Sequence, residues 1–249
     1  RDTMPLVVKK GRNKIATLWR FNCWGKKYPN YTHDEVIGAK LAPTMSAEPC
    51  VVATTDLDQV VLEGGAIDVD GCGLLLATEE CLLSKEQGRN PGFSKRDYED
   101  LFRKAFGIQR VAWLAGGIVG DDTHGHPDDV ARFTGPGRVV AAVENNTEDE
   151  NYEVLCENYR RLSEAGLEVT GIPMPRPIVY EDTRVPASYL NFYIGNRIVV
   201  VPTFSDPNDQ IALDVLAEHF PNREVVSIDA CDLVWGLGTF HCLAMQEPA

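Results

Sequence analysis

Apolar residues recur with a helical period in several stretches of the chain. Residues 96–106 carry apolar side chains at positions i, i+3, i+4 and i+7, which form one face of an α-helix. Residues 149–164 repeat this pattern and are followed by Gly166, a residue type that commonly ends helices. Residues 208–220 show a third apolar face. We therefore expect three amphipathic helices, and a short fourth helix over residues 34–41.

Short apolar runs between these helices predict strands over residues 15–21, 51–55, 59–67, 73–78, 111–114, 139–144 and 225–228. Residues 23–29 predict an irregular segment. A helix followed by a charged or glycine turn and then a strand occurs at both 106–111 and 220–225. This recurrence indicates either supersecondary repeats around a common centre or an ordinary α/β domain, and the pattern alone does not favour one of them.

The composition narrows the classes of partner. With 249 residues, 44% of them hydrophobic, the chain is long enough for one large domain or two small ones. The net charge is −13, which argues against nucleic acid and anionic membranes and is compatible with a small cationic substrate. No apolar run approaches the ~20 residues of a membrane span. The sequence leaves a homo-oligomer open.

The cysteines indicate neither a zinc ribbon nor a redox dithiol. Seven are present, none in a CxxC pair, and several lie in apolar runs. This usage predicts a reducing compartment, so we expect a cytoplasmic protein.

Cys242 is the cysteine in the most unusual setting, because it follows a glycine-rich turn that begins at Gly236. A thiolate nucleophile needs a partner that lowers its pKa or accepts its proton. His241 is adjacent, but neighbouring side chains of a strand point to opposite faces. We therefore expect His126 to be the partner. The alternative is a buried, inert thiol.

Residues 122–129 form a polar segment after an apolar strand and a glycine turn. His124, His126 and Asp128 are candidate metal ligands, although a metal site requires three or four converging donors. Alternatively, one of the two histidines is a general acid/base, and Asp128 orients it or anchors the substrate. A solvated polar turn is the third reading.

Glu63 ends the apolar run at residues 60–62 and precedes Gly64 and Gly65. A carboxylate that leaves a buried strand requires a partner, which favours a functional site over a surface charge. A glutamate facing a turn is the alternative.

Taken in order, four motifs resemble the agmatine deiminases of the guanidine-modifying enzymes. They are Arg-Asp-Thr at 1–3, Glu-Gly-Gly at 63–65, Gly-His-Pro-Asp-Asp at 125–129 and Gly-Leu-Gly-Thr-Phe-His-Cys at 236–242. Supporting stretches lie at 19–29, 78–83, 186–193 and 201–204, so the resemblance covers essentially the whole chain. Peptidyl-arginine deiminases are related to this family.

The resemblance implies the pentein fold, an α/β propeller of repeated ββαβ modules. It also implies hydrolysis of the guanidinium of agmatine to N-carbamoylputrescine and ammonia, a step of putrescine biosynthesis, with no metal or organic cofactor. Residues 1–249 would then be one catalytic domain. Because the segment that usually precedes Arg-Asp is absent, we expect a chain that is incomplete at its N-terminus, lacks most of the first module, and folds poorly or has low activity.

The resemblance also implies a role for each site residue. Asp2 and Asp128 match the aspartates that grip the guanidinium, and Cys242 matches the nucleophile, which would form a covalent amidino-cysteine intermediate. His126 matches the general acid/base, and Glu63 matches the carboxylate that orients it. Asp122 is the expected partner of the distal ammonium of agmatine.

Three alternatives remain open. The chain could be an arginine or peptidyl-arginine deiminase, in which Arg176 or Arg184 would meet the substrate carboxylate. It could be a truncated, inactive binding protein. It could also be a metal hydrolase that uses His124, His126 and Asp128.

Overall fold

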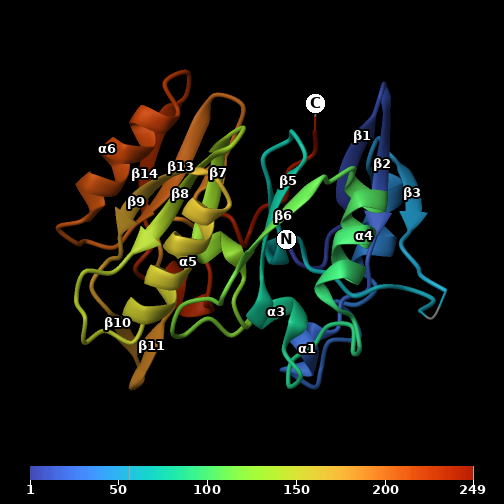
Figure 1. Cartoon of the computed structure of the whole chain (residues 1–249), viewed down its shortest axis with the longest axis horizontal. Coiled ribbons are helices and arrows are strands. Elements are labelled where there is room, and N and C mark those ends of the chain that lie inside the picture. The colour runs from blue at the N-terminus through green and yellow to red at the C-terminus, as the bar shows by residue number, and fades with distance from the viewer. Residues whose placement is uncertain (56, 249) are drawn as a thin grey trace.

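The computed structural model describes residues 1–55 and 57–248, and its elements repeat one topological unit (Figure 1). In each unit two antiparallel strands are followed by one or more helices and by a third strand that runs parallel to the second. Four such three-stranded sheets occur among the described residues. The recurring helix–turn–strand junctions of the sequence therefore belong to repeated modules.

The first two modules occupy the N-terminal half of the chain. The first consists of β1 (Leu6–Lys10), β2 (Asn13–Leu18), the short helices α1 (Cys23–Lys26) and α2 (Ile37–Leu41), the 3-10 turn η1 (Ala42–Thr44) and β3 (Glu48–Val51). The second consists of β4 (Asp68–Val69), β5 (Leu74–Thr78), α3 (Glu79–Leu83), α4 (Lys95–Phe106) and β6 (Arg110–Leu114).

The last two modules follow the same order with a single helix each. The third consists of β7 (Ala131–Gly135), β8 (Arg138–Val143), α5 (Tyr152–Glu164) and β9 (Glu168–Pro173). The fourth consists of β12 (Tyr193–Ile194), β13 (Ile198–Thr203), α6 (Asp209–His219) and β14 (Glu224–Asp229). Between them lies a hairpin of β10 (Ile178–Tyr180) and β11 (Thr183–Val185).

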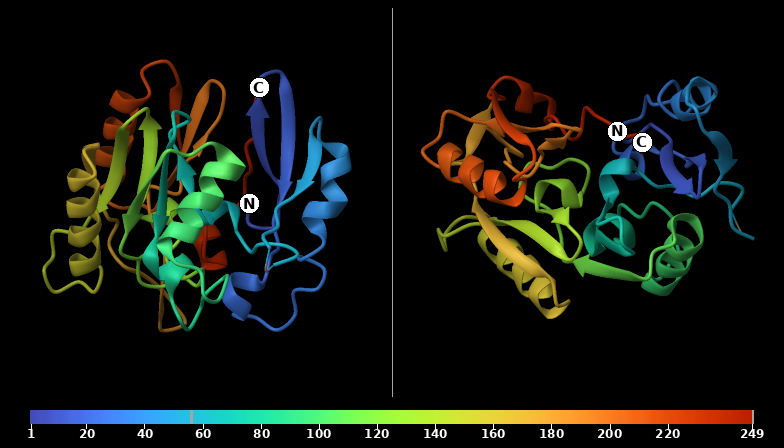
Figure 2. Two further views of the ribbon diagram at one scale, coloured as in Figure 1. Left: turned by 45° about the vertical axis from the view of Figure 1, so that its right-hand side comes forward. Right: turned by 90° about the horizontal axis from the view of Figure 1, so that it is seen from above.

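The modules lie around a common centre, with the long helices α4, α5 and α6 on the outside (Figure 2). Strand β5 contributes to two buried apolar clusters, because Leu75 and Ala77 join one while Leu76 joins the other. The alternation of side chains along a strand explains this division. Arg1 contacts the C-terminal segment, since its guanidinium donates to the His241 carbonyl (2.7 Å) and to Gln246 (2.9 Å). The 3-10 turns η2 (Gly64–Ala66) and η3 (Pro127–Asp129) lie between modules in the sequence, and η4 (Leu233–Gly236) follows the fourth module.

The predicted helices are present, with ends set by local capping. Helix α4 begins after Ser94, whose hydroxyl accepts from the Asp97 N–H while the Asp97 carboxylate accepts from the Ser94 N–H. Gly107 ends it in the left-handed region, with φ +74°. Helix α5 begins at Tyr152 rather than at residue 149, because residues 147–151 form turns. No helix in the described part of the chain has the length and apolarity that a membrane span requires.

Two predicted strands are wrong in part. Residues 59–67 contain an isolated bridge between Arg20 and Val61 and then the turn η2, so they are not a strand. Their apolar run is buried as irregular chain that leads into Glu63. The strand expected at 51–55 is β3, which ends at Val51 and pairs with β2. The pattern missed β1, β4, β7, β9, β10, β11, β12 and β13, some of which are only two or three residues long or contain glycine and proline.

Candidate active site

Glu63 and Arg89 form an ion pair whose side chains are both 0% exposed. Arg89 Nε donates to both carboxylate oxygens of Glu63, at 2.9 and 3.2 Å. Burial alone would raise the pKa of Glu63, but the neighbouring guanidinium lowers it overall, so the carboxylate is ionised. Arg89 also donates to the carbonyls of Thr123 (2.6 Å) and Gln87 (3.1 Å), which ties the pair to the loop before His126.

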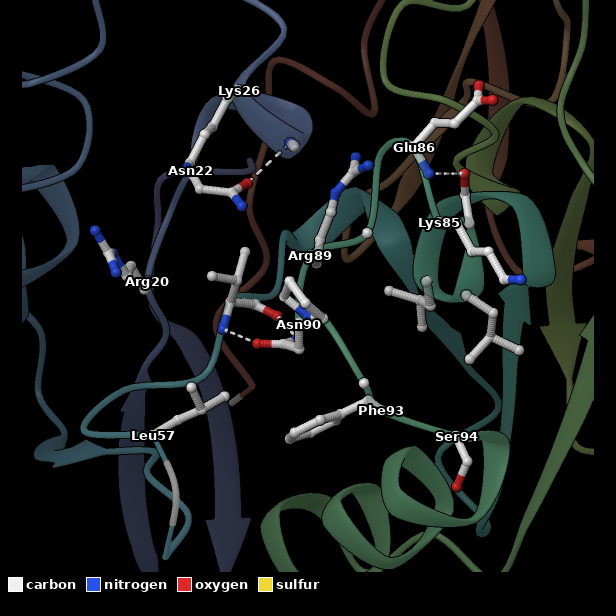
Figure 3. A pocket seen from close by; sticks show the side chains of 18 of the residues that line it. Arg20, Asn22, Lys26, Leu57, Lys85, Glu86, Arg89, Asn90, Phe93 and Ser94 are labelled. Carbon is white, nitrogen blue, oxygen red and sulfur yellow. Dashed lines mark hydrogen bonds between the residues drawn. The ribbon is translucent and has the colours of Figure 1, made fainter.

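Arg89 lies in the wall of a cavity of about 780 Å³ between α1 and the loop that precedes α4 (Figure 3). Arg20, Lys26 and Lys85 also line it, and Arg20 pairs with Glu35 at 2.9 Å. Among the described residues, its lining includes no member of the predicted site, and Arg89 itself was not predicted. The cavity is therefore separate from the cluster around Cys242.

His126 lies between two carboxylates. Its Nδ1 is 3.8 Å from Asp2 Oδ2, and its Nε2 is 3.9 Å from Glu63 Oε2. The ring is buried, and within the described residues neither nitrogen has a hydrogen-bond partner. Burial acts to lower the pKa of His126, but Asp2 and, more weakly, Glu63 raise it well above its usual value overall. The resting imidazole is therefore protonated and has free N–H groups to donate.

Asp2 is fixed by two donors. Trp24 Nε1 donates to Oδ2 at 2.9 Å, and the Gly65 N–H donates to Oδ1 at 2.8 Å. Burial acts to raise the pKa of Asp2, but His126 lowers it overall, so this carboxylate is ionised. A Cβ on Gly65 would lie 2.4 Å from His126 Nδ1 and 2.9 Å from Asp2 Oδ1, so only glycine fits between them.

Asp128 brings His241 and Cys242 together. Its Oδ2 is 2.5 Å from His241 Nδ1 and 3.6 Å from Cys242 Sγ. The expectation that His241 points away from the thiol is wrong, because residues 240–243 form turns rather than a strand. The adjacent histidine contacts the carboxylate, however, and not the sulfur. Asp128 Oδ1 is buried and has no partner among the described residues.

The thiol of Cys242 is half-buried and protonated in the resting site. Burial is the largest cause that raises its pKa well above the usual value, and the carboxylates of Asp128, Asp129 and Asp2 add to it. Asn191 Nδ2 lies 3.0 Å from Sγ and acts in the opposite direction. A cation placed among these carboxylates would remove much of the penalty on the thiolate.

The rings of Trp24 and Tyr28 form an aromatic wall, and Asp122 lies at one end of it. Its Oδ2 accepts from Tyr28 O–H at 2.6 Å, which is the main cause that raises the pKa of Tyr28 to about 12. Tyr28 meets Trp24 edge-on, with ring centroids 6.0 Å apart. Since Trp24 also holds Asp2, the wall runs from Asp2 to Asp122.

The predicted metal ligands do not converge. Among residues 1–55 and 57–248, the one group of such donors within 4.8 Å of one another is Glu63, Cys81 and His126, without His124 or Asp128. Both oxygens of Glu63 already accept from Arg89. A dication there would face a buried guanidinium, which opposes metal binding.

The structure thus places His126 between Asp2 and Glu63, and Cys242 beside Asp128. The charges of Asp2 and His126 act on Asp128, which links the two sets. Sequence reasoning missed Arg89, Asn191 and the role of His241. The position of Glu63 at the end of a buried run predicted that a cationic partner exists, but nothing in the sequence identified Arg89 as that partner. Such a cluster is suited to holding a planar cation beside a thiol.

Comparisons with known proteins show which family this chain resembles. The model of the Porphyromonas-type peptidyl-arginine deiminase family matches residues 1–248. A putative agmatine deiminase of Selenomonas ruminantium is 36% identical, over 100% of this chain and 73% of its own. One of Latilactobacillus sakei is 34% identical, over 100% and 74%.

Solved structures show the same fold. The agmatine deiminase of Enterococcus faecalis superposes with a TM-score of 0.88 at 32% identity, covering 100% of this chain and 74% of that one. A substrate-bound agmatine deiminase of C. jejuni gives 0.87 at 28%, covering 97% and 70%. Together with the match over residues 1–248, these similarities show that the chain has the pentein fold and belongs to the Porphyromonas-type peptidyl-arginine deiminase family.

Proposed function

We propose that this protein hydrolyses the guanidinium of agmatine to N-carbamoylputrescine and ammonia. The observation that carries the proposal is the buried Oδ1 of Asp128, which has no hydrogen-bond partner in the described part of the chain, while the other oxygen of this carboxylate lies 3.6 Å from Cys242 Sγ. A guanidinium offers paired N–H donors in one plane, which is what such a carboxylate lacks. Relatives named as agmatine deiminases support this substrate.

Asp2 and Asp128 hold the guanidinium in this proposal. Asp2 is ionised, and burial raises the pKa of Asp128 to about 6, so both carry charge at neutral pH. The bound cation lowers the pKa of Cys242, and the thiol proton leaves to solvent. The substrate therefore activates the nucleophile that attacks it.

The covalent step follows from the charge on His126. The thiolate of Cys242 attacks the central guanidinium carbon and forms a C–S bond. The protonated His126 gives its proton to the leaving nitrogen, the C–N bond breaks, and ammonia departs. The product of this step is an amidino-cysteine cation, and His126 is left neutral.

Hydrolysis returns the site to its starting state. The neutral His126 takes a proton from water, and the resulting hydroxide adds to the amidino carbon. The C–S bond then breaks, the hydroxyl proton passes to the thiolate, and the urea group of N-carbamoylputrescine is released. Glu63 stays ionised beside His126 and favours its protonated form. A cysteine-to-serine variant of the C. jejuni enzyme with substrate bound supports a thiol-dependent step.

The aromatic wall suggests where the aliphatic tail of agmatine lies. It would run along Trp24 and Tyr28 from Asp2 towards Asp122, whose carboxylate would meet the distal ammonium. Arg176 and Arg184, the candidate partners of an arginine carboxylate, already pair with Asp206 (2.7 Å) and Asp149 (2.9 Å). These pairs favour agmatine over arginine.

The test is ammonia release from agmatine, free arginine and a blocked arginine peptide at equal concentrations. The proposal requires agmatine to be turned over fastest, with Asp122→Asn raising KM for agmatine more than it lowers kcat. Faster turnover of arginine or of the peptide would replace the proposal with a deiminase of that substrate. The cytoplasmic location and any homo-oligomer remain predictions, which fractionation of cells and light scattering of the purified protein would test.

A further inference from the structure

Asn191 contacts both the loop that carries Cys242 and the sulfur itself. We infer that its side chain has two separable roles: the carboxamide oxygen holds the nucleophile loop, and the amide nitrogen stabilises the thiolate that attacks the substrate. The inference rests on the proposed role of Cys242 as the nucleophile. It adds Asn191 to the residues that touch a reacting atom.

The oxygen of Asn191 is the main attachment of the loop. Its Oδ1 accepts from the backbone N–H groups of Thr239 (3.1 Å), His241 (3.1 Å) and Cys242 (3.2 Å), and from Thr239 Oγ1 (3.0 Å). The Asn191 carbonyl accepts from the His241 N–H as well, at 3.0 Å. Since the loop belongs to no strand or α-helix, these bonds fix its position.

The nitrogen of Asn191 is directed at two acceptors. Nδ2 lies 2.8 Å from Asp129 Oδ1 and 3.0 Å from Cys242 Sγ. An amide has two N–H groups, so both are used. The reverse orientation would place the NH₂ against the backbone N–H groups of Thr239, His241 and Cys242, so the contacts allow only this one. Asp129 therefore helps to aim the second N–H at the sulfur.

The charges around the sulfur explain why a donor is needed. Cys242 faces the acidic side chains of Asp128, Asp129 and Asp2. Burial and these carboxylates raise the pKa of the thiol, while the bond from Asn191 lowers it. Within the described residues, Asn191 Nδ2 is the one donor to Sγ.

Asn191→Asp keeps an acceptor for the loop and replaces the donor to sulfur by an oxygen, while Asn191→Leu removes the donor without adding a charge. A higher thiol pKa in both variants is the result that the inference requires. The measurement is the rate of alkylation of Cys242 by iodoacetamide against pH, followed by the mass of its peptide. The inference predicts a thiol pKa higher by at least about one unit, which means about tenfold slower alkylation at a given pH below it. It also predicts a lower kcat with KM for agmatine largely unchanged. An unchanged alkylation profile would overturn the inference and leave Asn191 as a clamp only.

Thr239→Val is the matched control. It removes a donor to Asn191 Oδ1 and leaves the contact with Cys242 in place, so the melting temperature should fall while the alkylation profile stays that of the unmodified chain. A shift of that profile as large as the one in Asn191→Asp would assign the effect to loop position and overturn the second role.

If Asn191→Asp does not fold, the unmodified chain still provides a test. In protein labelled with ¹⁵N-asparagine, the side-chain amide signal of Asn191 should move with pH at the midpoint of alkylation, and should not move in Cys242→Ala. If the chemical shift of this amide signal does not change as the thiol ionises, the inference is overturned. Because alkylation needs no agmatine, these results do not depend on turnover, whereas an unmodified chain that releases no ammonia from agmatine would overturn the proposed function and leave the contact between Asn191 and the thiol to be tested by alkylation.

Discussion

His241 Nδ1 lies 2.5 Å from Asp128 Oδ2, so the histidine next to the candidate nucleophile holds the substrate anchor instead of the thiol. Burial is the main cause that lowers the pKa of His241 well below its usual value, and Arg132 and Arg1 lower it further. A neutral His241 donates its Nδ1 hydrogen to Asp128. This bond occupies one carboxylate oxygen and leaves Oδ1 free for a guanidinium.

Asp128→Asn should abolish activity and stabilise the fold at neutral pH. Burial raises the pKa of Asp128 from 3.8 to about 6. Between these values the folded chain holds a proton that the unfolded chain has lost, so the free energy of unfolding falls as the pH rises from 3.8 to about 6. Asparagine removes this cost, and an amide oxygen can still accept from His241. We expect the free energy of unfolding in urea to rise by up to about 3 kcal/mol near pH 8. The gain should vanish near pH 4, and a loss of stability at pH 8 would contradict the burial of an ionised carboxylate.

The pH profile of turnover should show the ionisation of Asp128. Below about pH 6 this carboxyl is protonated and no longer attracts the guanidinium, so kcat/KM for agmatine should fall about tenfold per pH unit. Stopped assays of ammonia release from about pH 5 to pH 9 measure this fall of kcat/KM on the acidic side of the profile. A kcat/KM that stays level down to pH 5 would show that ionisation of Asp128 does not control substrate capture.

Arg89→Met should destabilise the chain strongly, because it leaves the carboxylate of Glu63 buried without its cation. Loss of one partner of a buried ion pair costs about 3–5 kcal/mol. The matched control is Arg103→Met, since Arg103 pairs with Asp100 on the surface and should contribute less than about 1 kcal/mol. Urea unfolding of both variants provides the comparison.

The double variant Glu63→Gln/Arg89→Met separates stability from activity. Removing both charges should restore much of the stability lost in Arg89→Met, while turnover stays low because the negative charge beside His126 is gone. Recovery of full turnover in the double variant would show that Glu63 does not act on His126.

Gly65→Ala should lower kcat/KM, although it adds only one methyl group. The new Cβ would lie 2.4 Å from His126 Nδ1, so the histidine or Asp2 must move. A displacement of about 1 Å in an active site can cost about 10²-fold in rate, which is the loss of kcat/KM that we expect. Gly236→Ala is the control, because nothing lies within 4 Å of its added Cβ. Equal activity of the two variants would contradict the close approach at Gly65.

The sequence predicted the long helices well and the strands less well. Helix α4 has both a capping box at Ser94 and a glycine end at Gly107, which are local signals. The run at residues 60–62 is as apolar as a strand, but it is buried as irregular chain because it must deliver Glu63 to the centre. Apolarity alone does not distinguish these two outcomes.

The site was predictable where its residues lie in contiguous motifs. Cys242, His126 and Asp128 are part of such motifs, and the structure places them near one another. Arg89 was not predictable, because its pairing with Glu63 spans 26 positions and depends on the tertiary fold. His241 was misplaced since a strand was assumed where the chain turns.

The most direct measurement is ammonia release from agmatine by Cys242→Ala beside the unmodified chain and Cys72→Ser, a variant of an exposed cysteine. We predict that Cys242→Ala loses at least about a thousandfold in kcat, as expected when a nucleophile is removed, while Cys72→Ser retains full activity. Intact mass of the unmodified chain, quenched during turnover, should show the amidino adduct on Cys242. Turnover by Cys242→Ala at the rate of the unmodified chain would contradict the account.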